Sequence, residues 1–215
     1  MPEPKNFLPL STIHGLYRGY QTGISKPSVV VRAYLDEIER LNPRLGAYQE
    51  VWADTAIEMA VAADKALAAG YSVGPFHGVP YALKDIFHVK GKVTTCGSAA
   101  MLDNVAGTTS TVVERLTAAG GIILGKTKTV ECAFGGWGTN QKLGTPMNPW
   151  DMNAHRIPGG SSSGTAVAVA GNMAPCGMGR DTGGSGRLPA AFCGCVGRQA
   201  TAGGLPSPGG MPLTP

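Results

Sequence analysis

The chain has 215 residues, of which 43% are hydrophobic and 15% charged. These proportions are typical of a globular domain and exclude a disordered or membrane-embedded chain. The net charge of +4 is spread along the sequence without a cluster of Lys and Arg, so we expect no nucleic-acid partner. No apolar stretch is long enough to span a bilayer, so we expect no membrane partner either.

The cysteines and the N-terminal residues indicate a cellular location. Residues 1–20 lack the basic start and apolar run of a secretory signal. The 5 cysteines are odd in number and lack the paired CxxC spacing of zinc sites. We therefore predict a cytoplasmic protein with free thiols, no metal and no cofactor.

Apolar residues at helical spacing predict three helices. The first can be capped by Ser25, has Pro27 at its second position and ends at residues 42–43, which are Asn-Pro. The second spans about 54–69 and the third 109–119, each followed by glycine.

Short apolar runs predict buried strands at 78–83, 122–124 and 174–178. A helix of small residues is expected at 166–170. Helices that alternate with short apolar strands predict an α/β layered fold.

Residues 156–165 read RIPGGSSSGT and open this small-residue helix. Their serines can present hydroxyls to a ligand while backbone N–H groups at the helix start face the same point. The same segment is also compatible with a flexible Ser/Gly linker or a plain N-cap.

Residues 179–189 read GRDTGGSGRLP and place Ser185 after two glycines. Glycines at such a turn let successive N–H groups converge on one oxygen, as in an oxyanion hole. A simple glycine turn between a strand and a helix is the alternative.

Residues 79–86 read VPYALKDI and end an apolar run with Lys84. Apolar surroundings disfavour the charged form of a lysine, and a neutral lysine can act as a general base. The alternative is an exposed charge at the end of a strand.

Taken in order, LKD, GGSS and DTGGS resemble the amidase signature family, and the spacing of Ser161 and Ser185 is that of the family. The likeness extends over nearly the whole chain, including residues 124–136, 148–149 and 192–197. It implies an amidase signature fold in which α-helices cover a mixed β-sheet. Residues 1–215 would form its N-terminal part, and the abrupt end at 211–215 suggests that the domain is incomplete at the C-terminus.

The resemblance implies a relay of Ser, cis-Ser and Lys. Ser185 matches the nucleophile, Ser161 the bridging serine after a cis peptide at Gly160, and Lys84 the base. The backbone N–H groups of the nucleophile turn would hold the oxyanion, those of Thr182, Gly183, Gly184 and Ser185 itself. Three further residues match supporting positions: Ser162 in the proton relay, and Asp181 and Arg187 in tying down the loops.

These assignments predict an amidohydrolase that cleaves a carbon-nitrogen bond of a small-molecule amide through an acyl-enzyme. A homodimer or a small accessory subunit would be its protein partner. Two alternatives stay open, a subunit that releases ammonia from glutamine for a partner and an inactive truncated fragment.

The sequence departs from the family pattern at four positions. Ser163 stands where glycine is commoner, Arg180 where Thr is usual, Gly186 where a branched apolar residue is usual, and Lys128 where Asn is usual. Ser163 and Gly186 together resemble the branch that acts on urea-like amides such as allophanate or carboxybiuret.

Two other patterns suggest different functions. Residues 120–127 match the phosphate-loop pattern GxxxxGKT, but the residues between its glycines read as a core strand rather than a pliable loop. Residues 160–164 match GxSxG with Ser162 at the centre, a motif that requires a later histidine. The last histidine in this sequence is His155.

Overall fold

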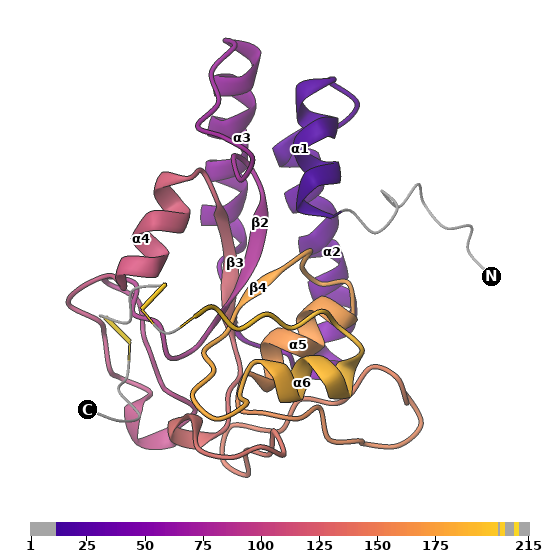
Figure 1. The fold of residues 1–215 in the computed structure, drawn as a ribbon, viewed down its shortest axis with the longest axis vertical. Helices are drawn as coiled ribbons and strands as arrows, with labels where there is room; N and C mark the ends of the chain where they lie inside the picture. The colour runs from indigo at the N-terminus through magenta and orange to yellow at the C-terminus, as the bar shows by residue number, and fades with distance from the viewer. Residues whose placement is uncertain (1–11, 202, 205–208, 211–215) are drawn as a thin grey trace.

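The computed structural model describes residues 12–201, 203, 204, 209 and 210. Its centre is a four-stranded sheet in the order β1-β3-β2-β4. Strand β2 (Pro80–Lys84) runs parallel to β3 (Ile122–Thr127) and to β4 (Gly177–Met178), whereas β1 (Tyr48–Val51) is antiparallel to β3 (Figure 1). This mixed sheet covered by helices confirms the expected fold class. The ends of the chain, on which the expectations about a signal and about the C-terminus rest, lie outside the described residues.

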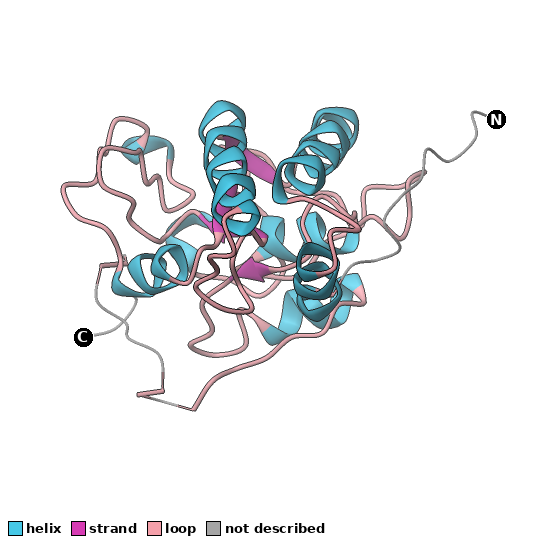
Figure 2. Cartoon of the chain, turned by 90° about the horizontal axis from the view of Figure 1, so that it is seen from above, coloured by secondary structure: helices cyan, strands magenta, loops and turns pink. Residues whose placement is uncertain are grey.

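Side chains of β2 and β3 alternate between two hydrophobic cores. Ala82 and Leu124 face a core shared with α1 (Ile13–Gln21), α2 (Pro27–Leu45), α3 (Ala53–Ala68) and α5 (Ser163–Ala170). Leu83 and Ile123 face a second core, which includes α4 (Thr111–Ala118). Seen from above, helices surround the strands (Figure 2). Because both faces are buried, the strands are nearly continuous apolar runs, as parallel strands usually are.

The helix predicted between a Ser25 cap and a stop at Asn42-Pro43 differs from the observed α2 at both ends. Its N-cap is Lys26, which makes no side-chain capping bond, and Ser25 does not cap the helix. Instead Asp64 of α3 accepts hydrogen bonds from the Ser28 backbone N (3.1 Å) and hydroxyl (2.5 Å). A tertiary contact thus does the work of a local cap.

The helix also continues through Pro43 to Leu45, so the expected stop at Asn42-Pro43 is wrong. Pro43 lies in the last turn, where its ring removes a single helical hydrogen bond. Gly46 then ends the helix in the left-handed conformation (φ 61°), donating to the Asn42 carbonyl at 2.8 Å.

Three elements were not expected from the sequence: α1, β1 and α6 (Arg187–Cys193). Strand β3 also extends further than predicted, to Thr127. Two short 3-10 turns, Ala99–Met101 and Glu131–Ala133, complete the described structure. Residues 122–127 are therefore strand and not a phosphate loop, which excludes the nucleotide-binding alternative for this segment. Across the described ranges, no helix combines the length and the apolar character needed to cross a membrane.

Candidate active site

Lys84 ends strand β2, and its side chain has no exposed surface. Its Nζ donates a hydrogen bond to Ser161 Oγ at 2.7 Å. The pKa of this amine is lowered to about 7, mainly by burial and also by the charge of Arg180, while Cys96 and Asp181 oppose the shift. A large share of Lys84 is therefore neutral at neutral pH and able to accept a proton.

Ser161 is held from its backbone side. The peptide bond from Gly160 to Ser161 is cis, as the family resemblance implied. The Ser161 carbonyl accepts hydrogen bonds from Thr129 Oγ1 (2.9 Å) and from the Val130 N–H (3.3 Å). The Gly160 N–H donates to the Gly136 carbonyl at 2.7 Å. We call these four contact residues, Thr129, Val130, Gly136 and Gly160, the Ser161 cradle.

Helix α5 starts two residues after Ser161, with Ser162 as its N-cap, and packs closely against the residues that follow β3. Gly164 has no room for a side chain, since a Cβ there would lie 2.2 Å from the Ala47 carbonyl oxygen and 2.5 Å from the Lys128 N. Its N–H donates to the Lys128 carbonyl at 2.9 Å. The serine-rich segment is thus a closely packed helix start rather than a flexible linker.

Asp181 organises the loop that contains Ser185. Its carboxylate accepts the N–H groups of Gly184 (2.6 Å), Gly186 (3.1 Å) and Arg187 (3.0 Å). The Arg187 guanidinium adds two bonds, from Nε at 2.9 Å and from NH2 at 3.1 Å. The Arg187 guanidinium, together with the backbone N–H groups, holds the pKa of Asp181 well below its usual range. The loop thus folds around the Asp181 carboxylate.

The backbone of Ser185 contacts that of Ser162, although the second step of the expected relay is not closed. The Ser162 N–H donates to the Ser185 carbonyl at 3.1 Å, which brings the two serine segments together. Within the described residues, the Ser185 hydroxyl has no hydrogen-bond partner. Ser162 Oγ donates to the Arg180 carbonyl at 3.4 Å. The structure therefore joins Lys84 to Ser161 and leaves Ser185 adjacent.

The expected set of oxyanion donors needs one correction. The Gly184 N–H points to the Asp181 carboxylate and is not available to an oxyanion. The N–H groups of Thr182, Gly183 and Ser185 have no acceptor among the described residues. The Asp181 carboxylate accepts the N–H of Gly184, three residues further along the chain, and this bond closes the turn.

A second lysine at this end of the sheet was not predicted as part of the site. Lys126 of β3 is 1% exposed and pairs with Asp85 at 2.7 Å. Asp85 Oδ2 also accepts the Thr95 hydroxyl (2.5 Å) and N–H (3.1 Å). Asp85 follows Lys84 directly in the sequence, but its negative charge is paired with Lys126 rather than with Lys84. The only signal of this pair in the sequence is that Asp85 and Lys126 each follow a buried apolar run.

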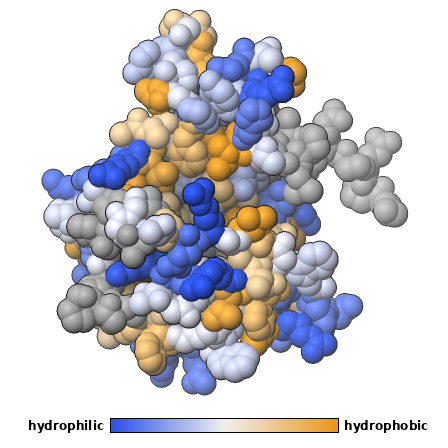
Figure 3. Space-filling view, in the orientation of Figure 1, coloured by the Kyte–Doolittle hydropathy of each residue, from blue (hydrophilic) through white to orange (hydrophobic). Residues whose placement is uncertain are grey.

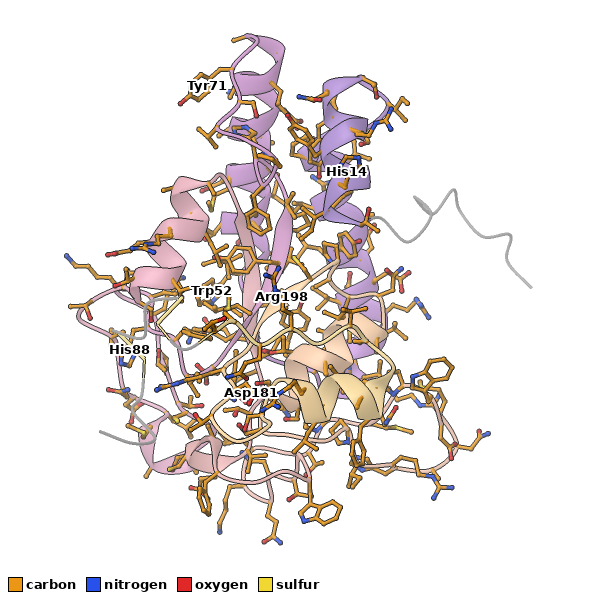
Figure 4. All side chains as sticks on the ribbon, viewed as in Figure 1. His14, Trp52, Tyr71, His88, Asp181 and Arg198 are labelled. Carbon is orange, nitrogen blue, oxygen red and sulfur yellow. The ribbon has the colours of Figure 1, made fainter. Side chains whose placement is uncertain are left out.

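The segment after α6 contacts the loop that contains Ser185. Gln199 Nε2 donates to the Asp181 carbonyl at 3.1 Å. Hydrophilic residues gather across the middle of the face in Figure 3, where Figure 4 labels Asp181 and Arg198. Among the residues placed in the structure, no group of three His, Cys, Asp or Glu side chains gathers as metal ligands would.

Solved structures with this arrangement of elements include enzymes that act on amides. The X-ray structure of the native peptide amidase from Stenotrophomonas maltophilia superposes with a TM-score of 0.88 and 34% sequence identity. The match covers 95% of this chain and 43% of that enzyme. This chain therefore shares its fold with a portion of that enzyme.

The model of the Amidase family matches residues 29–215, and the chain belongs to that family. Curated relatives include one component of the glutamyl-tRNA(Gln) amidotransferase of Acidothermus cellulolyticus, 48% identical over 82% of this chain and 34% of the relative. The same component of the Chromohalobacter salexigens enzyme is 43% identical over 89% of this chain and 39% of the relative. The chain thus spans well under half the length of these relatives.

Proposed function

We propose that residues 1–215 form the nucleophile-bearing part of an amidase signature domain that cleaves a carbon-nitrogen amide bond of a small molecule. The observation that carries the proposal is the 2.7 Å hydrogen bond from Lys84 Nζ to Ser161 Oγ at a fully buried position. A lysine that is half neutral near pH 7 can start a proton relay without a histidine.

In the proposed reaction Lys84 accepts the Ser161 hydroxyl proton as Ser161 accepts that of Ser185. The bond from the Ser162 N–H to the Ser185 carbonyl brings the two serine segments together, and the proposal requires Ser185 Oγ to adopt a rotamer that reaches Ser161 Oγ. The Ser185 oxygen then attacks the amide carbonyl to form an acyl-enzyme. The relay run in reverse protonates the leaving nitrogen, and water releases the acyl group.

The oxyanion of the tetrahedral intermediate would be held by the N–H groups of Thr182, Gly183 and Ser185, which have no acceptor among the described residues. Gly184 takes a different role, since its bond to Asp181 fixes the turn. Each well-placed donor of this kind contributes roughly 3 to 4 kcal/mol to acyl-transfer catalysis.

Covalent labelling tests which serine is the nucleophile. A fluorophosphonate reacts with an activated serine, and trypsin separates Ser185, in residues 181–187, from Ser161 and Ser162, in residues 157–180. We expect the adduct on 181–187 and its loss in Lys84→Ala and Ser161→Ala. Thr182 shares the peptide, so Ser185→Ala identifies the labelled hydroxyl.

Ser162→Ala tests the supporting role expected for Ser162 and should keep most of the labelling, because Ser162 Oγ donates to the Arg180 carbonyl and not to Ser161 or Ser185. An adduct on 157–180 would instead support a nucleophile elbow centred on Ser162. Absence of both an adduct and ammonia release from simple amides would refute the proposal.

A second candidate is the release of ammonia from glutamine for a partner, favoured by the two amidotransferase components that match most of this chain. Ammonia release from glutamine, measured with and without the other subunits of such a complex, distinguishes it from a free-standing amidase. A glutaminase rate that appears only with the partner selects the amidotransferase. The cytoplasmic location and the homodimer or accessory subunit stay predictions.

A further inference from the structure

Two cysteines lie in a pair of tight turns that are hydrogen-bonded to each other next to the Ser161 cradle. One turn closes with the Ser98 N–H donating to the Thr95 carbonyl (2.9 Å), and it carries Cys96. The other closes with the Ala133 N–H donating to the Val130 carbonyl (2.8 Å), and it carries Cys132. The Cys132 N–H donates to the Cys96 carbonyl at 2.8 Å, which joins the two turns directly.

This hydrogen bond limits the separation of the two Cα atoms. The N–Cα bond of Cys132 is about 1.46 Å, and a carbonyl oxygen lies about 2.4 Å from its own Cα. With the N···O distance of 2.8 Å, the two Cα atoms cannot be more than about 6.7 Å apart. Disulfides span Cα separations of about 4.4–6.8 Å, so this pair is within bonding range.

Both cysteines occupy backbone conformations that suit glycine or asparagine better. Cys96 and Cys132 each have φ of 51°. Side chains at such positions often have a function that depends on them. Both positions carry a thiol, and their turns are hydrogen-bonded to each other, so we look for a function that the two thiols share.

The two thiols differ in exposure, as a reactive pair does. Cys132 is exposed, whereas Cys96 is 2% exposed. Burial, and then the nearby Cys132, raise the pKa of Cys96 to about 11, and the charges of Lys84, Asp85 and Lys126 also act on it. An oxidant from solvent therefore reaches the exposed Cys132 before the buried Cys96.

We propose that Cys96 and Cys132 form a reversible disulfide under hydroperoxide stress. The peroxide transfers one oxygen to the Cys132 sulfur, giving a sulfenic acid and an alcohol, or water in the case of hydrogen peroxide. The Cys96 sulfur then displaces the hydroxyl from Cys132, and the Cys96 proton leaves with it as water. Two thiols are oxidised and one peroxide is reduced, so the step balances.

The bond would act on the site through the two turns. Cys132 lies two residues after Val130, whose N–H donates to the Ser161 carbonyl at 3.3 Å. Cys96 follows Thr95, which holds Asp85. A disulfide fixes these two turns to each other and thereby changes the setting of Val130 in the Ser161 cradle. This effect on turnover rests on the proposed function, whereas the cross-link itself does not.

Mass spectrometry tests the cross-link without an activity assay. Trypsin places Cys96 in residues 93–115, Cys132 in 129–142 and Cys176 in 157–180, with Cys193 and Cys195 together in 188–198. After hydrogen peroxide and thiol blocking, we expect 93–115 joined to 129–142, with two hydrogens lost, and its release by dithiothreitol. Cys132 oxidised but joined to no peptide, or joined mainly to 157–180 or 188–198, would overturn the proposal.

Turnover measured on the same samples tests the effect on the site. We expect peroxide to slow amide hydrolysis by on the order of tenfold, since small displacements of catalytic groups have effects of this size or larger. Dithiothreitol should restore the rate, Cys132→Ser should not respond, and Cys195→Ser should respond as the wild type does. A cross-linked, active protein with an unchanged rate would overturn the effect on the site. A protein with the cross-link but no amide hydrolysis before oxidation would contradict the proposed function alone.

Discussion

Replacing Lys84 with Met tests the neutral-lysine argument through stability as well as activity. Met fills similar space without the amine, and the site has no exposed surface. Folding lowers the pKa of the wild-type amine from 10.5 to about 7. Between these values the unfolded chain binds more protons than the folded one, so the stability of the wild type rises with pH in this window. Relative to an amine that is neutral in both states, the lowered pKa of Lys84 reduces the free energy of unfolding of the wild type by about 4 kcal/mol at pH 7 and about 2 kcal/mol at pH 9.

The substitution also removes the hydrogen bond to Ser161 Oγ, which costs about 1–3 kcal/mol for a buried hydroxyl left without its partner. Lys84→Met is therefore expected to be more stable than the wild type at pH 7 by about 1–3 kcal/mol. That advantage should shrink by about 2 kcal/mol between pH 7 and pH 9. Turnover of an amide should fall by at least about a thousandfold.

Urea unfolding at pH 7, 8 and 9 measures the free energy of unfolding of each variant. Lys142→Met is the matched control, because Lys142 is exposed and its removal should give the same difference at every pH. If the free energies of unfolding of Lys84→Met and the wild type differ by the same amount at pH 7 and pH 9, the lowered pKa of Lys84 is refuted. Retained turnover in Lys84→Met would refute the role of Lys84 as base.

Three further outcomes follow from the same structure. The value of kcat/KM for an amide should rise with pH to a plateau with its midpoint near 7, because only neutral Lys84 accepts the proton; a midpoint near 5 in the pH profile would point to a carboxylate base. Lys126→Met should destabilise the fold by about 3–5 kcal/mol in urea unfolding, because it leaves Asp85 buried and unpaired, and adding Asp85→Asn should recover part of the loss. Asp181→Asn should lower kcat by about 10- to 100-fold with little change in the far-UV circular dichroism, since it loosens the loop around Ser185, and an unchanged kcat would argue against that role.

The sequence predicted features that depend on local pattern. The apolar run before Lys84 is strand β2, and the lysine at its end is buried as its neighbours suggest. The small residues after Ser161 form α5, because Gly164 permits a close approach that any side chain would block. Where local preference and tertiary packing agree, the sequence alone was sufficient.

Features set by distant parts of the chain were not predictable. Asp64 caps α2 from another helix, which no spacing around Ser25 reveals. Strand β1 has only four residues, and its place beside β3 depends on a pairing from Tyr48 to Thr127. The Gly184 N–H turns to Asp181 because of a carboxylate three residues away, and the motif alone does not show whether that amide faces the carboxylate or the substrate.

The two buried lysines lie on opposite faces of one sheet and meet different partners. In the register of β2 and β3, Lys84 pairs with Thr127, and Leu83 pairs with Lys126, so the lysines lie on opposite faces. Lys126 meets the carboxylate of Asp85, which favours its charged form against the cost of burial. Lys84 meets a hydroxyl, and no acid forms an ion pair with it among the described residues. Since Asp85 is occupied by Lys126 and Thr95, the acid next to Lys84 in the sequence does not hold its proton, and the amine is left able to act as a base.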